Sequence, residues 1–518
     1  SQSTTVPRAI PQRNASDSVI ASWILVIATL WCVCWFVHAW HYWEDDAYIH
    51  LEFARNIVEG HGYSFNGLLV NGDTSPLWVL LLAAMHSVVP NWLVAGKILT
   101  ALGAIFAVAG TYFFAKHLTK NLDNNKTFAA AMVLLLVTNP YFCYWSFSGM
   151  EALTATGLAF WGALVAVRET PTWASFFAGC FLAGVAPVLR PEMLVFTGLV
   201  CLLLLWQWLR LPGDTFSGTK MLALLAGLIL VAAPLAAWSA YALHAFGHIV
   251  PNTNAAKRAG PGQSVVKRLL NVYGLGFPLI LAEIAGLAIF AAVRPAAIKK
   301  DSGERNLLGI LPAATWIFVV WSLVATVFYI VDHTYVQTRY IFVTAPELML
   351  AMLVFNYQRL PRLAYRVSLA GALLAAVVVS VIATWPLVRN KGVEDQKIAE
   401  MAAFVHNDLP PTDALAIYSI GEMAFDSQHP LIDTGGITRP DLIRYLNDHH
   451  GKTVEWAQAQ GAKYYDSYEQ PAPGAVLVFS VTVPNIGWSL HHRSYSRINT
   501  LRIWKLPTSP EAVTSSKL

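Results

Sequence analysis

The stretch WEDDAYIHLEFARNIVEGHGYSFNG, from Trp43 to Gly67, follows directly after the first long apolar segment of the chain. It contains three consecutive acidic residues, Glu44, Asp45 and Asp46. Because an ionised side chain is costly in hydrocarbon, we expect this acidic run to lie in water or in a wet cavity at the membrane edge. A carboxylate in such a cavity can accept a proton from a hydroxyl group. The stretch is therefore the leading candidate for a catalytic site.

The composition of the chain is typical of a polytopic membrane protein. Of its 518 residues, 56% are hydrophobic and only 13% are charged, which is too apolar for an ordinary soluble domain. The 19 Trp and 19 Tyr residues suit the aromatic belts that form at the two membrane interfaces. The formal net charge of +4 is small for this length, so we expect no nucleic-acid partner.

Apolar segments of spanning length predict about eleven transmembrane helices. One further apolar segment, Leu77–Val89, has only about thirteen residues, fewer than a span needs. We expect it to form a re-entrant or interfacial helix. The predicted spans lie near residues 20–40, 94–115, 127–141, 151–168, 173–190, 193–210, 220–244, 273–293, 307–331, 341–357 and 364–386.

Basic residues predict how these spans are oriented. Arg8 and Arg13 favour a cytoplasmic N-terminus, and the loops rich in Lys and Arg then fall on the same side, provided that Leu77–Val89 does not cross. Residues 41–76, with six acids and one base, fall outside. The acidic stretch is thus predicted to face the exterior.

The chain changes character after its last predicted span. Residues 1–386 are predicted to form a mostly α-helical membrane domain, and residues 387–518 a soluble α/β domain outside the membrane. The second part is polar and contains no segment of spanning length. Short apolar runs at residues 414–420 and 475–481 suit buried strands.

The acidic residues of the external loops have two interpretations. Neighbouring residues at the start of a helix point in different directions, so one of Asp45 and Asp46 can act as a base while the other positions substrate or binds a metal. The alternative is ordinary capping of a helix N-terminus. Glu44 is a candidate for positioning substrate, and Glu151 can brace an acceptor site or only cap a helix. Possible sugar contacts, which are equally compatible with turns, are Asn66, Asn71, Asp73 and Thr74.

External cations are the second group of candidate site residues. A phosphate leaving group requires Lys or Arg nearby, although each such side chain can instead extend to lipid headgroups. Arg190 can also pair with Glu192 as a brace. Asn252 and Tyr335 are candidates for positioning substrate. The candidate phosphate-binding residues are Arg190, Lys257, Arg258, His333 and Arg339.

Short motifs in a fixed order resemble those of GT-C glycosyltransferases, which are integral-membrane enzymes that use polyprenyl-phosphate sugars. Within that class the chain looks most like bacterial arabinofuranosyltransferases. The resemblance covers roughly residues 20–385 and extends more weakly into the polar tail. The motifs are EDDAYI (44–49), ARN (54–56), GHGYSFNG (60–67), TSPLW (74–78), RPE (190–192), PNT (251–253) followed by Lys257, TRY (338–340) and DTGGITRPD (433–441).

The resemblance implies a GT-C-type helical bundle and an inverting transfer of a sugar, expected to be arabinofuranose, from a polyprenyl-phosphate donor. The acceptor would be a periplasmic glycan or protein, such as arabinan or pilin. Asp45 would supply the base with Asp46 in support, or the reverse, and Lys257 and Arg339 would hold the donor phosphate. No cofactor is expected to be required, although a divalent metal is compatible with the pattern. The implied location is the bacterial inner membrane, with the active site on the periplasmic face.

Three other functions are compatible with parts of the pattern. A flippase or transporter for a polyprenyl lipid would carry repeated halves and charges deep within its spans, and neither is evident in the sequence. A non-catalytic glycan-binding membrane protein would use the polar tail as its binding module. An oligosaccharide transferase with a diphosphate donor would depend on a metal.

Overall fold

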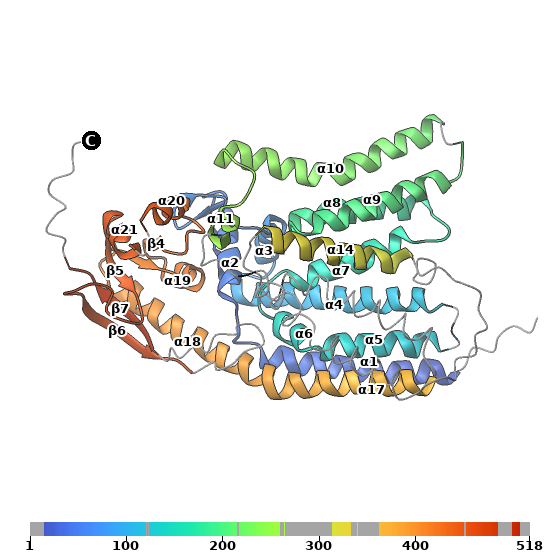
Figure 1. Cartoon of the computed structure of the whole chain (residues 1–518), viewed down its shortest axis with the longest axis horizontal. Helices are drawn as coiled ribbons and strands as arrows, with labels where there is room; N and C mark the ends of the chain where they lie inside the picture. Colours follow the sequence, from blue (N-terminus) through green and yellow to red (C-terminus); the bar gives the residue numbers. More distant parts are fainter. Residues whose placement is uncertain are drawn as a thin grey trace, which may run out of the picture.

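Apolar helices that lie side by side make up most of the molecule (Figure 1). The bundle contains α1 (Ala15–His38), α4 (Trp92–Leu118), α5 (Asn125–Thr138), α7 (Ala152–Ala166), α8 (Trp173–Leu189), α9 (Met193–Arg210), α10 (Gly218–Phe246), α14 (Ala313–Val331) and α17 (Arg362–Val379). The computed structural model describes residues 15–120, 122, 124–214, 217–258, 264, 313–332, 339, 362–449, 452–484 and 500–507.

Five helical segments within these described residues are long and apolar enough to cross a membrane. Their outer faces carry large exposed hydrophobic side chains, such as Leu30, Leu202 and Leu228, which is the surface that lipid requires. The five segments are Ser16–His38, Trp92–Leu118, Met193–Arg210, Gly218–Phe246 and Leu369–Asp408. The chain is therefore a multi-pass membrane protein.

Small residues allow the helices to approach closely. At the contact between α4 and α7, a Cβ atom on Gly103 would collide with the hydroxyl of Thr154, and a Cβ on Gly157 would collide with the ring of Phe106. Glycine at such positions is what permits tight packing where no hydrophobic force drives helices together.

Every predicted span within the described residues coincides in position with an apolar helix, although α5, α7 and α8 have only 14, 15 and 17 residues. Two predicted spans, at residues 273–293 and 341–357, lie outside the described residues, so the number of eleven stays a prediction. The apolar segment predicted to be re-entrant or interfacial is α3 (Pro76–His86). Its eleven residues extend only about 16 Å, roughly half of a membrane's hydrocarbon core.

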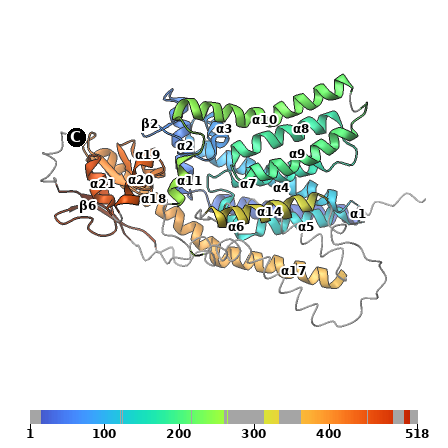
Figure 2. The ribbon, with the colours of Figure 1, turned by 45° about the horizontal axis from the view of Figure 1, so that its top comes forward.

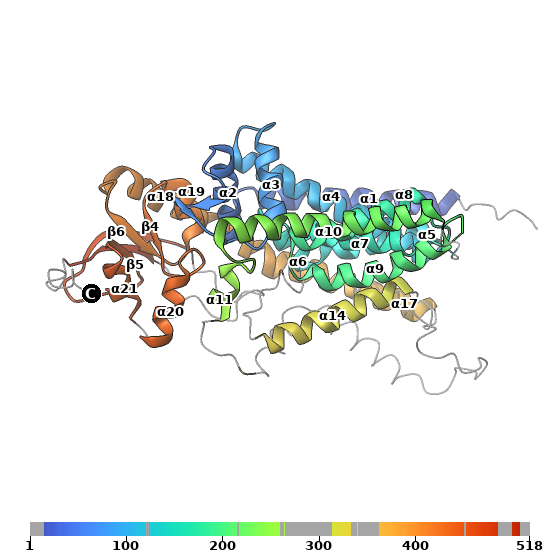
Figure 3. The same cartoon turned by 90° about the horizontal axis from the view of Figure 1, so that it is seen from above.

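Short elements gather at one end of the bundle. The acidic stretch forms α2 (Asp45–Val58), which is followed by a small antiparallel hairpin of β1 (Ser64–Phe65) and β2 (Leu68–Leu69). Two further short helices, α6 (Pro140–Trp145) and α11 (Asn252–Arg258), lie at the same end. Figure 3 shows α2, α3 and α11 at the end of the bundle that faces the C-terminal strands.

The C-terminal part begins without a break in the helical path. After α17 the chain makes a π-helical turn, η3 (Ser380–Thr384), and continues as α18 (Trp385–Asp408). Figure 2 shows α18 leading obliquely from the bundle to the C-terminal strands. Pro386 near the start of α18 cannot donate a backbone hydrogen bond, which accounts for the irregular turn before it.

A five-stranded mixed sheet forms the centre of this C-terminal part, in the order β4-β3-β5-β7-β6. β3 pairs in parallel with β4 and β5, whereas β7 pairs antiparallel with β5 and β6. The strands are β3 (Ala414–Ile417), β4 (Leu431–Asp433), β5 (Ala462–Asp466), β6 (Val476–Thr482) and β7 (Thr500–Lys505), and the helices are α19 (Ile420–Ser427), α20 (Pro440–Asp448) and α21 (Thr453–Ala459).

The prediction of a buried strand at residues 475–481 is wrong in one respect. The strand exists as β6, but it lies at the edge of the sheet and Val476 is 61% exposed. The apolar run at 414–420 does contain a buried strand, β3, although α19 begins at Ile420. An apolar run alone does not distinguish a central strand from an edge strand.

The C-terminal part is packed directly onto the acidic stretch, because α19 contacts α2 and α18 contacts α19. One continuous cluster of buried hydrophobic residues includes Leu51 and Phe53 of α2 together with Met423 and Ala424 of α19. This packing holds α2 between the membrane helices and the C-terminal sheet.

Candidate active site

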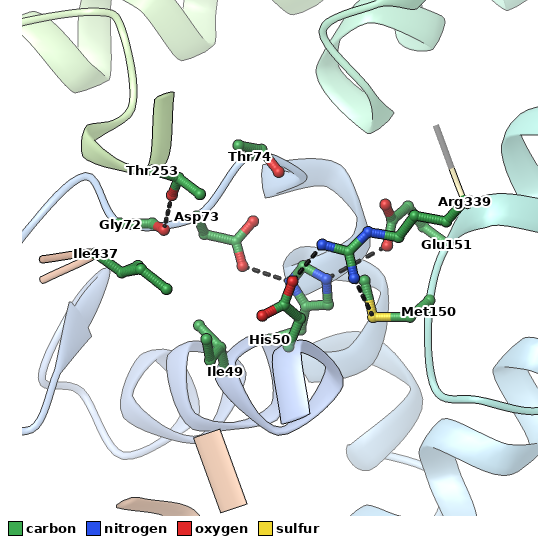
Figure 4. A pocket seen from close by; sticks show the side chains of 11 residues that line it. Ile49, His50, Gly72, Asp73, Thr74, Met150, Glu151, Thr253, Arg339 and Ile437 are labelled. Carbon is green, nitrogen blue, oxygen red and sulfur yellow. Dashed lines mark hydrogen bonds and ion pairs between the residues drawn. The ribbon is translucent and has the colours of Figure 1, made fainter. Parts of the chain in front are cut away.

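A cavity lies at the junction where α2, the loops of the bundle and the C-terminal part meet. Figure 4 shows side chains from all three regions converging on it. Its volume is small, about 30 Å³, and several charged side chains around it pair with one another. It is lined by Asp46, Ile49, His50, Gly72, Asp73, Thr74, Met150, Glu151, Thr253, Arg339 and Ile437.

Asp46 and Arg339 form an ion pair in the wall of this cavity. Arg339 is 4% exposed, and its guanidinium also lies over the ring of Trp145, 5.8 Å from the ring centroid, and donates to Met150 Sδ at 3.9 Å. The side chain of Asp46 is 28% exposed. The carboxylate therefore keeps access to the cavity while the cation is held by its surroundings.

Asp45 points elsewhere. Its carboxylate accepts hydrogen bonds from the backbone N–H groups of Gly421, at 3.3 Å, and Glu422, at 3.1 Å. Burial and the adjacent Asp46 raise the pKa of Asp45 to about 7, although the two N–H groups oppose this shift. A pKa near 7 suits a general base, but Asp45 does not line the cavity. Its carboxylate instead caps the first turn of α19.

His50 lies one helical turn after Asp46, on the same face of α2. Its Nδ1 is hydrogen-bonded to Asp73, and its Nε2 lies 3.3 Å from a carboxylate oxygen of Glu151. Burial alone would lower the pKa of His50, but Asp73 and Glu151 outweigh it and raise the pKa to about 10. The ring is therefore an imidazolium at neutral pH and adds a second cation to the cavity.

A buried ion network supports this histidine. Arg190 donates to Glu151 at 2.6 Å, and its Nε donates to Glu192 at 2.7 Å. Burial opposes the charged form of Glu151, but Arg190 and His50 hold the pKa of that carboxyl well below its usual range. Arg190 does not line the cavity. The structure thus gives it the bracing contact with Glu192 that was one of its two interpretations.

The remaining predicted site residues either do not line the cavity or have side chains that lie outside what the structure describes. Glu44 accepts hydrogen bonds from the hydroxyls of Tyr42, at 2.9 Å, and Tyr144, at 3.2 Å, and it does not line the cavity. The backbone N–H of Asn252 donates to the carbonyl of Asn71 at 2.8 Å, which joins α11 to the loop before α3. His333, Tyr335 and the side chains of Lys257 and Arg258 lie outside what the structure describes.

The C-terminal part contributes one wall of the cavity through the segment that contains DTGGITRPD. Asp433 accepts hydrogen bonds from the backbone N–H groups of Gly435, at 2.7 Å, and Thr438, at 2.6 Å. These bonds shape a tight turn, in which Gly436 adopts a positive φ of 78°. The turn directs Ile437 into the cavity (Figure 4).

Sequence reasoning missed several cavity residues. His50 was detectable, because a residue four positions after Asp46 shares its helix face. Thr253 and Ile437 lie within the PNT and DTGGITRPD motifs, but neither they nor Met150 has a residue type that marks a site residue, and the three come from distant segments. Thr253 is held in place by a hydrogen bond from its hydroxyl to the carbonyl of Gly72, at 2.6 Å.

The arrangement combines an accessible carboxylate with two cations. The carboxylate of Asp46 can take a proton from a hydroxyl, whereas Arg339 and His50 can stabilise negative charge that develops on a phosphate. Within the described parts of the chain, no three His, Cys, Asp or Glu residues are grouped so that they could hold a metal ion.

Comparison with known proteins gives the class of fold. A family model described as "Domain of unknown function (DUF8728)" matches residues 387–514, and no curated protein matches the chain. Crystal structures of ArnT from Cupriavidus metallidurans, one bound to undecaprenyl phosphate and one in the apo state, match with a TM-score of 0.57 each. Their identities are 14% and 15%, over 93% of this chain and 98% and 97% of theirs.

Two other solved structures match with lower scores. The Archaeoglobus fulgidus oligosaccharyltransferase has a TM-score of 0.47 at 14% identity, over 86% of this chain and 69% of that one. The mycobacterial arabinofuranosyltransferase AftD has a TM-score of 0.43 at 14% identity, over 94% of this chain and 42% of that one. The likeness to ArnT covers nearly the whole of both chains. The protein therefore has the GT-C fold that its sequence motifs predicted.

Proposed function

We propose that this protein is a membrane glycosyltransferase that moves a sugar from a polyprenyl-phosphate donor to an acceptor hydroxyl, with inversion at the anomeric carbon. The observation that carries the proposal is the pair of Asp46 and Arg339 in the wall of the cavity. A base and a phosphate-binding cation side by side are the two groups that such a transfer needs. The ArnT structure with bound undecaprenyl phosphate supports a donor of that lipid class.

In the proposed reaction the acceptor hydroxyl approaches Asp46, whose carboxylate takes its proton. The acceptor oxygen forms a bond to the anomeric carbon of the donor sugar, and the bond from that carbon to the phosphate oxygen breaks. The lipid phosphate leaves with the bonding electron pair. Arg339 and the imidazolium of His50 stabilise the negative charge on it.

The finer assignments follow from the sequence motifs. We propose arabinofuranose as the donor sugar and a periplasmic glycan or protein, such as arabinan or pilin, as the acceptor. The active site would face the periplasm from the bacterial inner membrane. Because a monophosphate leaving group carries less charge than a diphosphate and two cations are at hand, we propose that no metal is required.

Incubation of the purified protein with a panel of polyprenyl-phosphate pentoses and hexoses tests the proposal. Arabinan fragments and a pilin serve as acceptors, and mass spectrometry measures the released lipid phosphate and the glycosylated product. We expect release with at least one pentose donor, at equal rates with and without EDTA. Absence of product with every donor would overturn the proposal, and a rate restored only by a divalent metal would overturn the metal-free mechanism.

A further inference from the structure

A second cavity, of about 330 Å³, lies beside α2 and is separate from the candidate active site. Residues near the end of α1, at the start of α4, and on α18 and α19 surround it. This volume falls in the range of pockets that bind small molecules. The cavity is lined by Trp40, His41, Trp43, Tyr48, Asn91, Leu93, Val94, Lys97, Asp395, Gln396, Ala399, Glu422 and Asp426.

The cavity combines an aromatic wall with acidic groups. Trp43 and Tyr48 are buried and present their rings, whereas Trp40 is 39% exposed. Asp395 and Glu422 are buried. A largely apolar pocket with a few placed polar groups is the usual form of a site that recognises a specific small molecule.

The buried Lys97 does not neutralise these acids through hydrogen bonds. Its ammonium donates to the carbonyl oxygens of Ala39, at 2.9 Å, and of Tyr42 and Phe147, both at 2.5 Å. It also lies 4.5 Å from the ring centroid of Trp43. All three protons are thus used on the backbone, and Lys97 braces the wall of the cavity.

Glu422 places a buried carboxyl in the wall of this cavity. It is only 2% exposed and lines the cavity, and no hydrogen bond of its carboxyl is found among the described residues. Burying such a group without a partner is costly. Asp395, by contrast, accepts a hydrogen bond from the backbone N–H of Trp43 at 2.7 Å.

The charge state of Glu422 indicates which kind of ligand group it can bind. Burial, followed by the nearby Asp395 and Asp426, raises the pKa of Glu422 well above its usual range. A protonated carboxyl both donates and accepts a hydrogen bond. That capacity matches a hydroxyl group better than it matches a phosphate or another anion.

We propose that this second cavity binds a neutral saccharide unit of the acceptor glycan, with Glu422 as its hydrogen-bonding group and Trp40 and Tyr48 as its aromatic contacts. The inference rests on the proposed function for its identification of the saccharide as acceptor. α2 forms a wall of both cavities, with Tyr48 in this one and Asp46 and His50 in the other. One helix thus connects the saccharide site with the catalytic carboxylate.

Isothermal titration of the full-length protein in detergent, with neutral arabino-, manno- and gluco-oligosaccharides of two to six units as probes, tests the proposal. We expect at least one series to bind, Glu422→Met to weaken that binding tenfold or more, and Glu422→Gln, which keeps a neutral hydrogen-bonding group, to weaken it much less. Glu455→Gln, at an exposed ion pair with Lys452, is the matched control. Trp40→Ala, at a half-exposed position, gives a second variant should Glu422→Met fail to fold.

Each other outcome overturns the proposal. These outcomes are no saccharide binding to the wild type, unchanged binding in both Glu422→Met and Trp40→Ala, and binding that phosphatidylethanolamine vesicles displace, which would identify a lipid-amine site. Release of lipid phosphate in the presence of a single-sugar acceptor is measured separately. If the wild-type protein releases no lipid phosphate in this assay, the result counts against the proposed function and not against the saccharide site.

Discussion

The carboxylates of Asp45 and Asp46 serve two different parts of the molecule although the residues are neighbours. Asp46 pairs with Arg339 in the wall of the cavity, whereas Asp45 accepts hydrogen bonds from the first turn of α19. Successive side chains of a helix point about 100° apart, so the first turn of α2 can contact both the cavity and α19. We therefore assign the proposed base to Asp46 and the attachment of the C-terminal part to Asp45.

Asp45 predicts a pH dependence of stability. Its pKa in the folded protein is about 7, raised from an ordinary value of 3.8 by burial and by Asp46, so the unfolded chain releases this proton first as pH rises. The contribution of Asp45 to the free energy of unfolding is thus full below about pH 4 and is lost as pH rises through 7. Asp45→Asn, which does not titrate, should show a flatter profile of thermal unfolding between pH 4.5 and 8. Equal slopes in the two proteins would contradict this role.

Arg339 should matter for the transition state more than for folding. Arg339→Gln removes the cation nearest to Asp46, and removal of one such stabilising donor typically lowers kcat by about 100-fold or more. Steady-state release of lipid phosphate measures this effect. The control is Arg439→Gln, at a surface ion pair with Asp441, which should keep the wild-type rate. A similar rate loss in both variants would argue against a specific role for Arg339.

His50 should contribute to stability in a way that disappears at high pH. Its pKa is raised from 6.5 to about 10 by Asp73 and Glu151. Below about pH 6.5 both the folded and the unfolded chain carry the proton and the contribution is full, and it is lost as pH rises through 10. The difference in melting temperature between wild type and His50→Gln should therefore shrink between pH 7 and 10.5. A difference that does not change with pH would exclude a charged His50.

Glu151 should be essential for the buried ion network. Glu151→Gln leaves Arg190 and His50 without a shared counter-charge in a site where the side chains of Glu151 and Arg190 are each 3% exposed. Breaking a buried pair typically costs about 3–5 kcal/mol. The matched control Glu400→Gln disrupts an exposed pair with Lys397 and should cost less than about 1 kcal/mol. Thermal unfolding of both variants in one detergent measures the contrast, and equal losses would contradict the network.

Much of the fold could be predicted from local patterns. Apolar segments located the helices of the bundle, and the short segment at Leu77–Val89 forms a separate short helix, α3. That α3 does not cross the membrane stays a prediction. The edge position of β6 was not predictable, because which strands pair depends on contacts that are distant in the sequence. The interpretation of Ala475–Val481 as a buried strand failed for that reason.

The candidate site was less predictable than the fold. The acidic run pointed to the right helix, but the different partners of Asp45 and Asp46 depend on where α19 packs, and that is a tertiary contact. Ile437 enters the cavity only because Asp433 shapes the turn before it. His50 could have been found from helix periodicity, since it lies one turn beyond Asp46.

The initial rate of lipid-phosphate release by Asp46→Asn, measured beside Asp45→Asn with the same donor and acceptor, tests the central assignment most directly. Loss of a general base lowers the rate by roughly 100-fold to 10,000-fold, and we predict a loss in this range for Asp46→Asn. Asp45→Asn should stay within about fivefold of the wild type, because an asparagine oxygen can still accept the two N–H bonds. Wild-type turnover by Asp46→Asn, or a large loss confined to Asp45→Asn, would contradict the account.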